Sequence, residues 1–281
     1  MSDTMRTRLL TRLTNREVEA YLQRNDLIFI PVGTVEMHGA MPLDCETVLP
    51  EAIAVMLAER ADGLVLPNLP YFYPGGTTIG RGSVQISIRA GYDYLTEILK
   101  SLYKQGFKRI IFVSYHAPAE LTLDAVVRDT FDQRRLPIAH LNAVSSIYRF
   151  MHSPEGQQYA TEQDRSDEMM CAAYDLFGDL EDIPLTTEPI YDCSAPNPGT
   201  INQFGKLFSL GAFGFLYADP QEHLPTVQIP DAETRKALAL RGREILEHWL
   251  DWVRIDEMTE LMKDYDRFAK EEILSKYPWV R

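Results

Sequence analysis

Short, unbroken apolar runs alternate with amphipathic segments along the first half of the chain. Residues 27–32 form the clearest run, rich in β-branched and aromatic side chains, and a polar loop with glycine follows it directly. Residues 64–66, 109–114 and 137–141 show the same pattern of short strands covered on both faces. Because helical segments separate these runs, the pattern predicts an α/β fold, a three-layer αβα arrangement with a mostly parallel sheet.

Between the strands, apolar positions recur at the spacing of helices. The pattern predicts a helix over 15–23 with Asn15 as its N-cap, and a helix over 50–60 with Pro50 near its start. Further helices are predicted over 92–105, where Gly106 fits the helix stop, and over 121–134.

The second half of the chain is less regular. A helix is predicted over 168–177, ended by Gly178, and a long helix over 232–253. Residues 191–208 are rich in Pro, Asn and Gly and predict an irregular segment, whereas the charged residues 257–276 are expected to dock on the body or on a neighbour. A length of 281 residues favours one domain, residues 1–281, with a helical C-terminal extension from about residue 232.

Charge and cysteine content narrow the classes of function. A net charge of -13 repels nucleic acid and anionic membranes, so we expect neither as a partner and favour a small-molecule ligand. The apolar runs are too short to cross a bilayer, and the basic first twelve residues lack the apolar region of an export signal. Cys45, Cys171 and Cys193 show no Cys-x-x-Cys spacing, which argues against disulfides and thiolate zinc and favours a cytoplasmic location.

Metal-binding residue types gather after two of the predicted strands. Glu36, His38 and Glu46 follow the first strand, and His116 follows the strand over 109–114. Ligands of open α/β sheets bind beyond the carboxyl ends of the strands, and imidazole nitrogen with carboxylate oxygen suits Zn²⁺ or Mn²⁺. An ordinary polar loop fits the same spacing, because loop carboxylates are usually solvated and a histidine often bonds only a backbone group.

These segments resemble the creatininase family. Residues 31–39 read PVGTVEMHG, with Glu46 downstream, where the family has a PxGSxEQHG loop that leads to an Asp. Residues 113–116 (VSYH) stand where the family has NGH, and residues 82–87 and 211–214 resemble its PGTxSL and GVxGDP segments. The resemblance spans the chain from residue 27 to about residue 225.

The resemblance implies two divalent metal ions per chain, Zn or Mn, that share a bridging carboxylate. By position, Glu36 and His116 bind one ion, His38 binds the other, and Glu46 takes the bridging place; Glu36, His38 and His116 are also the implied catalytic residues. The chain departs from the family pattern in this loop, since Met41 replaces the second histidine, the loop is about one residue shorter and the bridge is Glu instead of Asp.

The last metal carboxylate stays open. The family's HAGExET segment is represented only by residues 162–170, in which Asp164 takes the ligand place by position and Glu168 is its neighbour on the helix. Asp44 is a further choice for a share of the bridge. Glu120 is another for the second ion, although it equally fits a carboxylate that only stabilises a helix N-terminus.

The implied reaction is the opening of a small ring by attack of metal-activated water on a carbonyl. Family substrates include creatinine and other cyclic amides, but the 3-dehydro-scyllo-inosose hydrolases open a cyclic diketone of inositol catabolism, and residues 36–46 and 66–77 are more similar to that branch. The loop of Tyr71, Tyr73, Thr77 and Arg81 would suit a polyol, although it equally fits an ordinary surface loop. The family also implies a homo-oligomer, usually a hexamer.

Two other classes of function stay open. The replacements at Met41 and Glu46 also fit a non-catalytic binding protein with a degenerate site. Cys45, close to His38 in the sequence, fits a cysteine hydrolase, although no nucleophile motif surrounds it and Cys often serves as a small buried hydrophobe.

Overall fold

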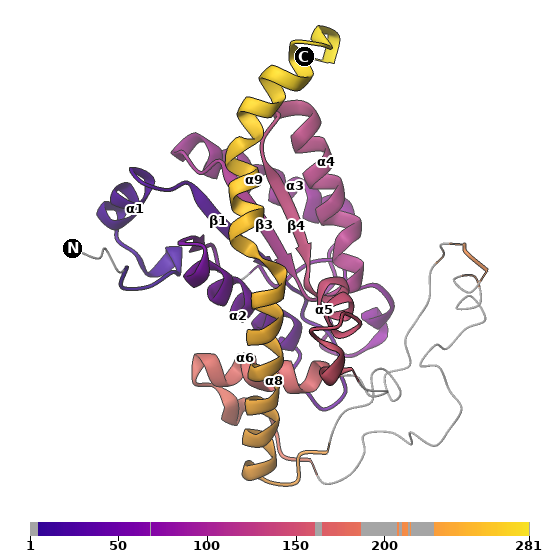
Figure 1. Ribbon diagram of the computed structural model, residues 1–281. Helices are drawn as coiled ribbons and strands as arrows, with labels where there is room; N and C mark the ends of the chain where they lie inside the picture. Colours follow the sequence, from indigo (N-terminus) through magenta and orange to yellow (C-terminus); the bar gives the residue numbers. More distant parts are fainter. Residues whose placement is uncertain are drawn as a thin grey trace.

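The computed structural model describes residues 5–67, 69–160, 165–186, 207, 210–212, 214 and 228–280. Within them, a four-stranded sheet has the order β2-β1-β3-β4 and only parallel pairs. Helices cover both faces of this sheet (Figure 1). The predicted α/β class with a parallel sheet is therefore confirmed.

The two central strands set the position of the candidate site. β1 (Leu27–Val32) and β3 (Arg109–Ser114) are buried along their whole length and pair in register from Leu27↔Arg109 to Val32↔Ser114. Both strands therefore end at the same edge of the sheet, and the segments that follow them emerge side by side. The outer strands are β2 (Leu64–Val65) and β4 (Ile138–Asn142).

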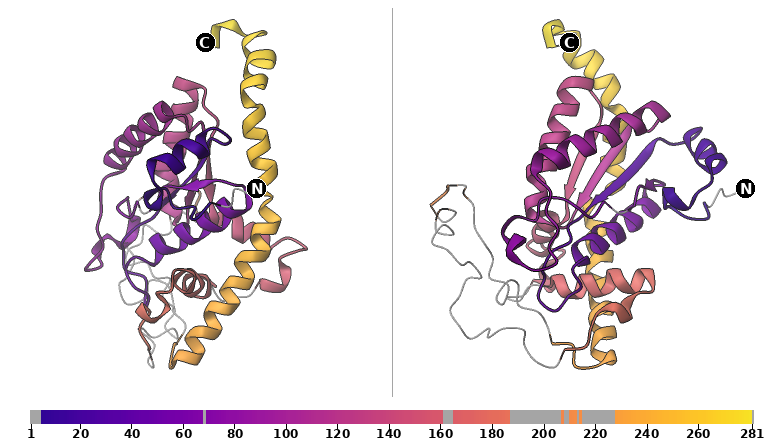
Figure 2. Two further views of the ribbon diagram at one scale, coloured as in Figure 1. Left: turned by 90° about the vertical axis from the view of Figure 1, so that its left-hand side faces the viewer. Right: turned by 180° about the vertical axis from the view of Figure 1, so that it is seen from behind.

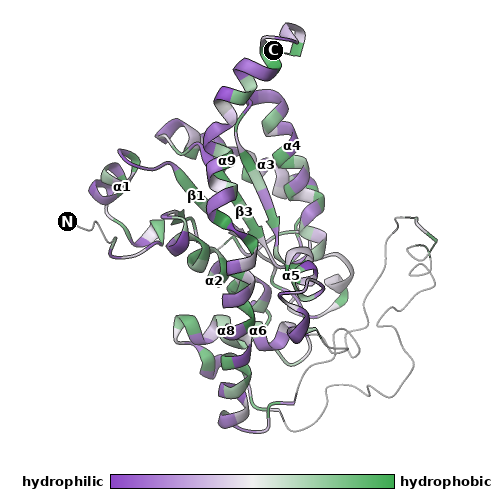
Figure 3. Ribbon diagram, in the orientation of Figure 1, coloured by the Kyte–Doolittle hydropathy of each residue, from purple (hydrophilic) through white to green (hydrophobic). Residues whose placement is uncertain are grey.

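Three helices cover one face of the sheet: α1 (Asn15–Leu22), α3 (Ile88–Gln105) and α4 (Glu120–Arg134). Alternate strand residues such as Phe112 point into the apolar cluster on this face, where Leu99 of α3 is also buried. Strand residues alternate between faces, so their neighbours supply the core on the other side. Figure 3 shows that the middle of the sheet is mainly hydrophobic, as is typical of strands that lie between two helical layers.

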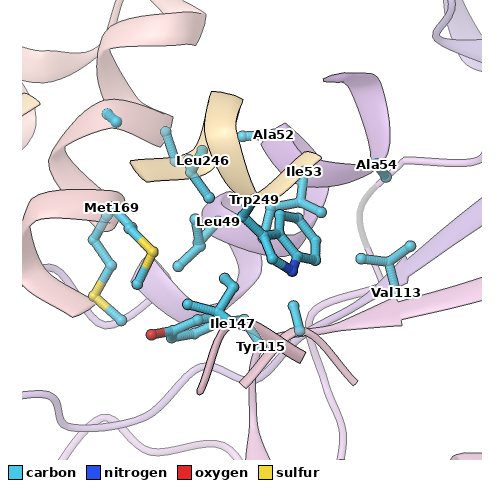
Figure 4. Packing of buried hydrophobic residues seen from close by; sticks show 14 of the residues in the cluster. Leu49, Ala52, Ile53, Ala54, Val113, Tyr115, Ile147, Met169, Leu246 and Trp249 are labelled. Atoms are coloured by element: carbon cyan, nitrogen blue, oxygen red, sulfur yellow. The ribbon is translucent and has the colours of Figure 1, made fainter. Parts of the chain in front are cut away.

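The opposite face carries the larger core. It is covered by α2 (Cys45–Arg60), α6 (Ser166–Phe177) and α8 (Ala232–Val253), and α5 (Ala143–Met151) closes one end. Trp249 of α8 is fully buried, and its indole nitrogen donates a hydrogen bond of 3.0 Å to Ser146 Oγ. Figure 4 shows Leu49 and Ile53 of α2 grouped with Trp249 in this core.

The C-terminal part continues α8 as a long projecting helix. α9 (Ile255–Phe268) and the wide helical turn after it, Ala269–Leu274, extend beyond the sheet (Figure 2). Short 3₁₀ turns complete the described structure: Leu10–Arg12, Gly75–Ile79, Ala117–Ala119, Gln157–Tyr159, Leu180–Asp182 and Pro278–Val280. No helix in the described ranges has both the length and the apolar character needed to cross a bilayer.

The predicted strands and the helix over 232–253 agree with the structure to within one residue at most ends, but several helix starts were wrong. The N-cap of α1 is Thr14 and not Asn15, because Thr14 and Glu17 form a reciprocal capping box. α3 begins at Ile88, where Ser87 caps it, and α5 was not predicted. The irregular segment 191–208 lies outside the described residues except for position 207.

α2 also begins earlier than predicted, at Cys45, so Pro50 lies inside the helix. A proline lacks the N–H that would bond the carbonyl four residues earlier, which here belongs to Glu46. The helix loses one backbone hydrogen bond near its start and continues. This earlier start moves Glu46 from the predicted loop into the first turn of α2.

Gly242 marks the closest approach between α6 and α8. A Cβ atom at Gly242 would lie 1.9 Å from the carbonyl oxygen of Glu168, a distance that only movement of the helix backbone could relieve. Glycine is costly inside a helix, so its presence in α8 reflects this contact and not helix propensity.

We expect Gly242→Ala to lower the free energy of unfolding by about 2 kcal/mol, because the overpacking cost exceeds the roughly 1 kcal/mol gained in helix propensity. Denaturant unfolding followed by circular dichroism measures the change. Leu240→Ala is the matched control on the same helix, since Leu240 is 59% exposed, and it should change stability by less than about 0.5 kcal/mol. A Gly242→Ala protein as stable as the wild type would mean that α6 and α8 are not in close contact there.

Candidate metal centre

Glu36, Glu46 and His116 meet beyond the carboxyl ends of β1 and β3. Each offers one ligand atom, and these atoms all lie within 4.8 Å of one another. All three residues are buried. We call this group the Glu36–Glu46–His116 cluster.

Glu36 lies in the loop that follows β1. Its Oε1 is 3.3 Å from Nε2 of His116, and its Oε2 accepts a hydrogen bond from the hydroxyl of Thr77. Burial raises the pKa of Glu36, but the hydrogen bond and charge of His116, with the hydrogen bond from Thr77, more than offset this and lower the pKa to about 2. Glu36 is therefore a carboxylate at neutral pH.

Gly33 allows Glu46 to approach the end of β1. A Cβ at Gly33 would lie 2.6 Å from the carbonyl oxygen of Glu46 and 2.5 Å from Cα of Thr47, so only glycine lets the first turn of α2 rest here. Thr34 fixes the result, since its hydroxyl donates to Oε2 of Glu46 at 3.2 Å and its carbonyl accepts from the Thr47 hydroxyl at 2.9 Å. The side chain of Glu46 is thereby held at the edge of the sheet.

His116 faces both carboxylates. Its Nε2 is 3.3 Å from Glu36 and 3.8 Å from Oε2 of Glu46, and its Nδ1 is buried without a hydrogen-bond partner among the described residues. Two carboxylates in one buried space repel each other unless a positive charge lies between them. Carboxylate oxygen and imidazole nitrogen are the ligands that Zn²⁺ and Mn²⁺ accept, so these residues fit a divalent metal ion.

His38 borders the same cluster. It is 2% exposed, and its Nδ1 lies 3.9 Å from Oε1 of Glu46, whereas His116 lies near Oε2 of the same carboxylate. Gly39, with φ of 57°, turns the loop back so that Met41 N donates to the carbonyl of His38 at 3.0 Å. Met41 itself is buried in the core, which accounts for an apolar residue where the family has a second histidine.

Three other carboxylates considered for the centre, all in the described part of the chain, lie outside the cluster. Glu168 forms ion pairs with Arg165 at 2.9 Å and with Arg241 at 3.0 Å. Glu120 accepts a hydrogen bond of 3.3 Å from the side chain of Asn142. Asp164 lies outside the described residues. Asp44 accepts a hydrogen bond from the hydroxyl of Tyr174 and so links the start of α2 to α6.

Asp167 is a buried carboxylate near the centre that the sequence analysis did not consider. It is 5% exposed, and its negative charge acts on Cys45, as do those of Glu46 and Glu36. The helical spacing of α6 contains the signal, because Asp167 lies three and four residues before the buried Met170 and Cys171, on the inward face. Its neighbour Glu168 lies toward the arginines.

The loop over residues 71–82 is attached to the centre through Thr77. Thr77 is buried and bonds Glu36, so it orients a carboxylate instead of offering a free hydroxyl. Tyr71 is 51% exposed, Arg81 is also exposed and Tyr73 is half-buried. In the loop that was predicted to bind substrate, Thr77 therefore lies inside the centre and Arg81 lies at the surface.

A Ser–His–Asp chain lies immediately before His116. Ser114 Oγ is 2.8 Å from Nε2 of His140, and Nδ1 of His140 is 2.7 Å from Asp124. Burial lowers the pKa of His140 against the opposing effect of Asp124, which favours the neutral imidazole; with Nδ1–H donating to Asp124, its Nε2 accepts from the Ser114 hydroxyl. Ser114 is 0% exposed, which removes it from contact with a substrate. The chain therefore ties β3 to β4 and α4 next to His116.

The fold and the cluster define a class of protein: α/β proteins with a carboxylate–imidazole cluster suited to a divalent metal at the carboxyl edge of a parallel sheet. A family model described as Creatininase, creatinine amidohydrolase, matches residues 11–171, more than half of the chain. The chain belongs to the creatininase family.

Two curated relatives match parts of the chain. A creatinine amidohydrolase of Pseudomonas putida is 30% identical over 111 residues, which are 37% of this chain and 43% of the relative. A 3-dehydro-scyllo-inosose hydrolase of Thermotoga maritima is 28% identical over 162 residues, 56% of this chain and 52% of the relative. The chain thus spans about half the length of the curated relatives it matches.

Solved creatininase structures share the fold. A crystal structure of creatinine amidohydrolase superposes with a TM-score of 0.62 at 20% identity, covering 95% of this chain and 98% of the other. A manganese form of creatininase gives a TM-score of 0.60 at 20% identity over 94% of this chain and 98% of its own. A mutant creatininase of the Zn-Zn type gives 0.60 at 19% identity, over 95% and 99%.

Cys45 is not placed to act as a nucleophile. It is 1% exposed, and burial, reinforced by the surrounding carboxylates, raises the pKa of its thiol well above the usual value. Burial also raises the pKa of Cys171, to about 12. A thiolate is the reactive form, so both thiols are inert in the folded protein.

We expect the Cys193→Ser variant to show no reaction with a disulfide reagent at pH 8 until it is unfolded, when Cys45 and Cys171 both react. Spectrophotometric thiol titration with and without denaturant measures this. The variant removes Cys193, which lies outside the described residues. Rapid labelling of Cys45 in the folded protein would restore the cysteine hydrolase as a candidate.

Proposed function

We propose that the protein is a metal-dependent hydrolase that opens a small cyclic substrate by attack of water on a carbonyl carbon. The buried Glu36–Glu46–His116 cluster, in a chain of the creatininase family, is the observation that carries this proposal. The names of the curated relatives, an amidohydrolase and a hydrolase, support it.

Glu36, Glu46 and His116 would hold one divalent ion, Zn or Mn. Glu46 lies 3.8 Å from His116 through one oxygen and 3.9 Å from His38 through the other, which suits a carboxylate that bridges to a second ion held by His38. A bound divalent ion would supply a Lewis acid that lowers the pKa of water and polarises a carbonyl oxygen.

The chain's own residues hold the two carboxylates in place. Thr77 bonds Glu36 and Thr34 bonds Glu46, and such partners fix the orientation of metal ligands. Ring opening adds the oxygen of water to the carbonyl carbon, breaks one ring bond and moves a proton to the leaving atom. The carboxylates and imidazoles of the cluster and His38 are the groups that can carry this proton.

Asp164 remains our proposal for the last metal carboxylate, on its position in the family pattern. The two arginine ion pairs of Glu168 count against that residue, since a ligand would have to leave both. Buried Asp167 is the alternative within the described residues, because its charge already acts on Cys45 at the start of α2.

For the substrate we propose a cyclic polyhydroxy diketone of the 3-dehydro-scyllo-inosose type, with creatinine or another cyclic amide as the alternative. The inosose hydrolase relative aligns over 162 residues and the creatinine amidohydrolase over 111. Tyr71, Tyr73 and Arg81 supply hydroxyl groups and a cation on a loop that Thr77 attaches to the cluster, which suits a polyol.

We also propose that the protein is a homo-oligomer, with the hexamer that the family resemblance implies as its upper size, and that it is cytoplasmic. Apolar side chains of the projecting C-terminal helix support assembly, since Leu261 is 69% exposed, Phe268 50% and Trp279 75%. Exposed apolar surface of this kind is typical of protein interfaces.

We expect Glu36→Gln and His116→Ala to lower turnover at least about 100-fold and to reduce bound metal, because each change removes a ligand of a buried cation. Elemental analysis of the purified protein measures the metal. Hydrolysis of 3-dehydro-scyllo-inosose and of creatinine, with and without chelator, measures activity and selects the substrate. Turnover that survives metal removal would contradict the proposal.

Two matched variants serve as controls for this experiment. Glu168→Gln should keep its metal, because Glu168 pairs with arginines outside the cluster. Ser114→Ala should keep more than about a tenth of the activity, because a buried neutral hydrogen bond contributes only about 1 kcal/mol. Loss of all activity in Ser114→Ala with full metal content would instead favour a serine hydrolase built on Ser114, His140 and Asp124.

We expect Arg81→Ala to raise the KM for the polyol diketone about tenfold, with kcat less affected, because a lost charge-assisted hydrogen bond costs about 1.5 kcal/mol. Arg89→Ala is the matched control, since Arg89 is exposed and pairs with Asp93 on α3. Steady-state kinetics measure both. An unchanged KM in Arg81→Ala would remove this arginine from the site.

A further inference from the structure

A recess lies at the edge of the sheet opposite to the Glu36–Glu46–His116 cluster. It has a volume of about 500 Å³ and is lined by the residues that precede β1 and β4, the start of β3, the end of α4 and one turn of α9. Since parallel strands all begin at this edge, the recess is separated from the cluster by the length of the strands. It belongs to a different site.

The lining of the recess is strongly basic. It contains one carboxylate, Asp26, and six cationic side chains: Arg24, Lys108, Arg109, Arg134, Arg135 and Lys263. The whole chain carries a net charge of -13, so this concentration of positive charge contrasts with the rest of the molecule. A concave surface lined by one sign of charge concentrates the opposite ion.

Some of these cations form the wall of the recess. Arg109 is 5% exposed and bonds the side chains of Asp26 and Asn25, so it holds the starts of β3 and β1 together. Arg24 pairs with Asp62, and Arg135 donates to the carbonyl of Val280 at 2.5 Å. These groups fix the shape of the recess.

Lys108 and Arg134 have no such role. Both are exposed, and neither forms an ion pair within the part of the chain that the structure describes. Their charges are therefore available to a ligand. Arginine pairs with phosphate in a bidentate manner, and lysine adds a point charge.

The remaining wall is apolar. Tyr103, which is 40% exposed, lies among the lining residues with Leu22, Leu136, Pro137 and Met262. A ligand that carries a flat ring beside its charged group can place the ring against this apolar wall, which a small inorganic anion cannot do. A volume of about 500 Å³ also lies within the range usual for small-molecule sites, roughly 300–1,000 Å³.

We propose that this basic recess binds a small metabolite with a phosphoanhydride group, of the nucleoside di- or triphosphate class. The phosphates lie against Lys108 and Arg134, and the ring lies against Tyr103. The site is distinct from the metal cluster and does not depend on the proposed hydrolase activity.

Isothermal titration of the full chain at low salt with ATP, pyrophosphate and adenosine tests the proposal. We expect ATP to bind, pyrophosphate to bind more weakly and adenosine not to bind, with affinity falling as salt rises. The double variant Lys108→Ala/Arg134→Ala should lose at least about tenfold in ATP affinity, while Lys236→Ala, an exposed lysine of α8 outside the recess, should lose none.

A nucleotide could also bind the metal centre, so the titration is repeated with Glu46→Gln. Unchanged ATP affinity in Glu46→Gln, with loss in the double variant, places the nucleotide in the recess. Equal affinity for pyrophosphate and ATP supports the phosphoanhydride site but removes the ring from Tyr103. Failure of both to bind, or equal loss in Lys236→Ala, overturns the proposal.

Discussion

Two glutamate side chains share one buried space at the end of the sheet, and this arrangement constrains the structure around it. Carboxylates held so close, away from water, repel each other and lose their hydration, so a cation or a proton must balance them. His116 faces both carboxylates, and a threonine hydroxyl donates a hydrogen bond to each of them. The geometry leaves the balance of charge to a ligand of opposite sign, which makes the centre suited to a divalent ion.

Close backbone contacts between the strands and α2 hold the residues of the cluster in position. Glycine at position 33 lets α2 begin directly against the end of β1. The side chain of Glu46 therefore extends toward His116 from a helix and not from a loop. Register pairing of β1 with β3 brings His116 beside the loop of Glu36. The hydrogen-bonded chain from Ser114 to Asp124 steadies the strand end from the opposite face. Each ligand therefore has a separate structural support.

Most of the fold could be predicted from the sequence, because buried parallel strands appear as short apolar runs. The end of α6 could also be predicted, because Gly178 has a positive φ of 85°, a conformation that favours glycine. The sequence also contained Glu36, Glu46 and His116, which short segments after the strands place together. The start of α2 before Pro50 could not be predicted, because proline is most common in the first turn of a helix and therefore indicates a start at that position. The analysis of the sequence also overlooked Asp167 in favour of Glu168, although the spacing of Asp167 from Met170 and Cys171 places it on the buried face of α6, while Glu168 pairs with Arg241 of α8.

The position of α8 late in the chain has a consequence during synthesis on the ribosome. All residues of the cluster have been synthesised once residue 116 is added, whereas Trp249, which packs over α2 in the core, is added much later. At about 5–20 residues per second, translation of that interval takes roughly 7 to 27 s. During this interval the nascent chain has all residues of the cluster, but the apolar face of α2, and that of α6 once residue 177 has been added, lacks the cover of α8. The nascent chain thus has most need of a chaperone after the residues of the cluster have been synthesised and before α8 is complete.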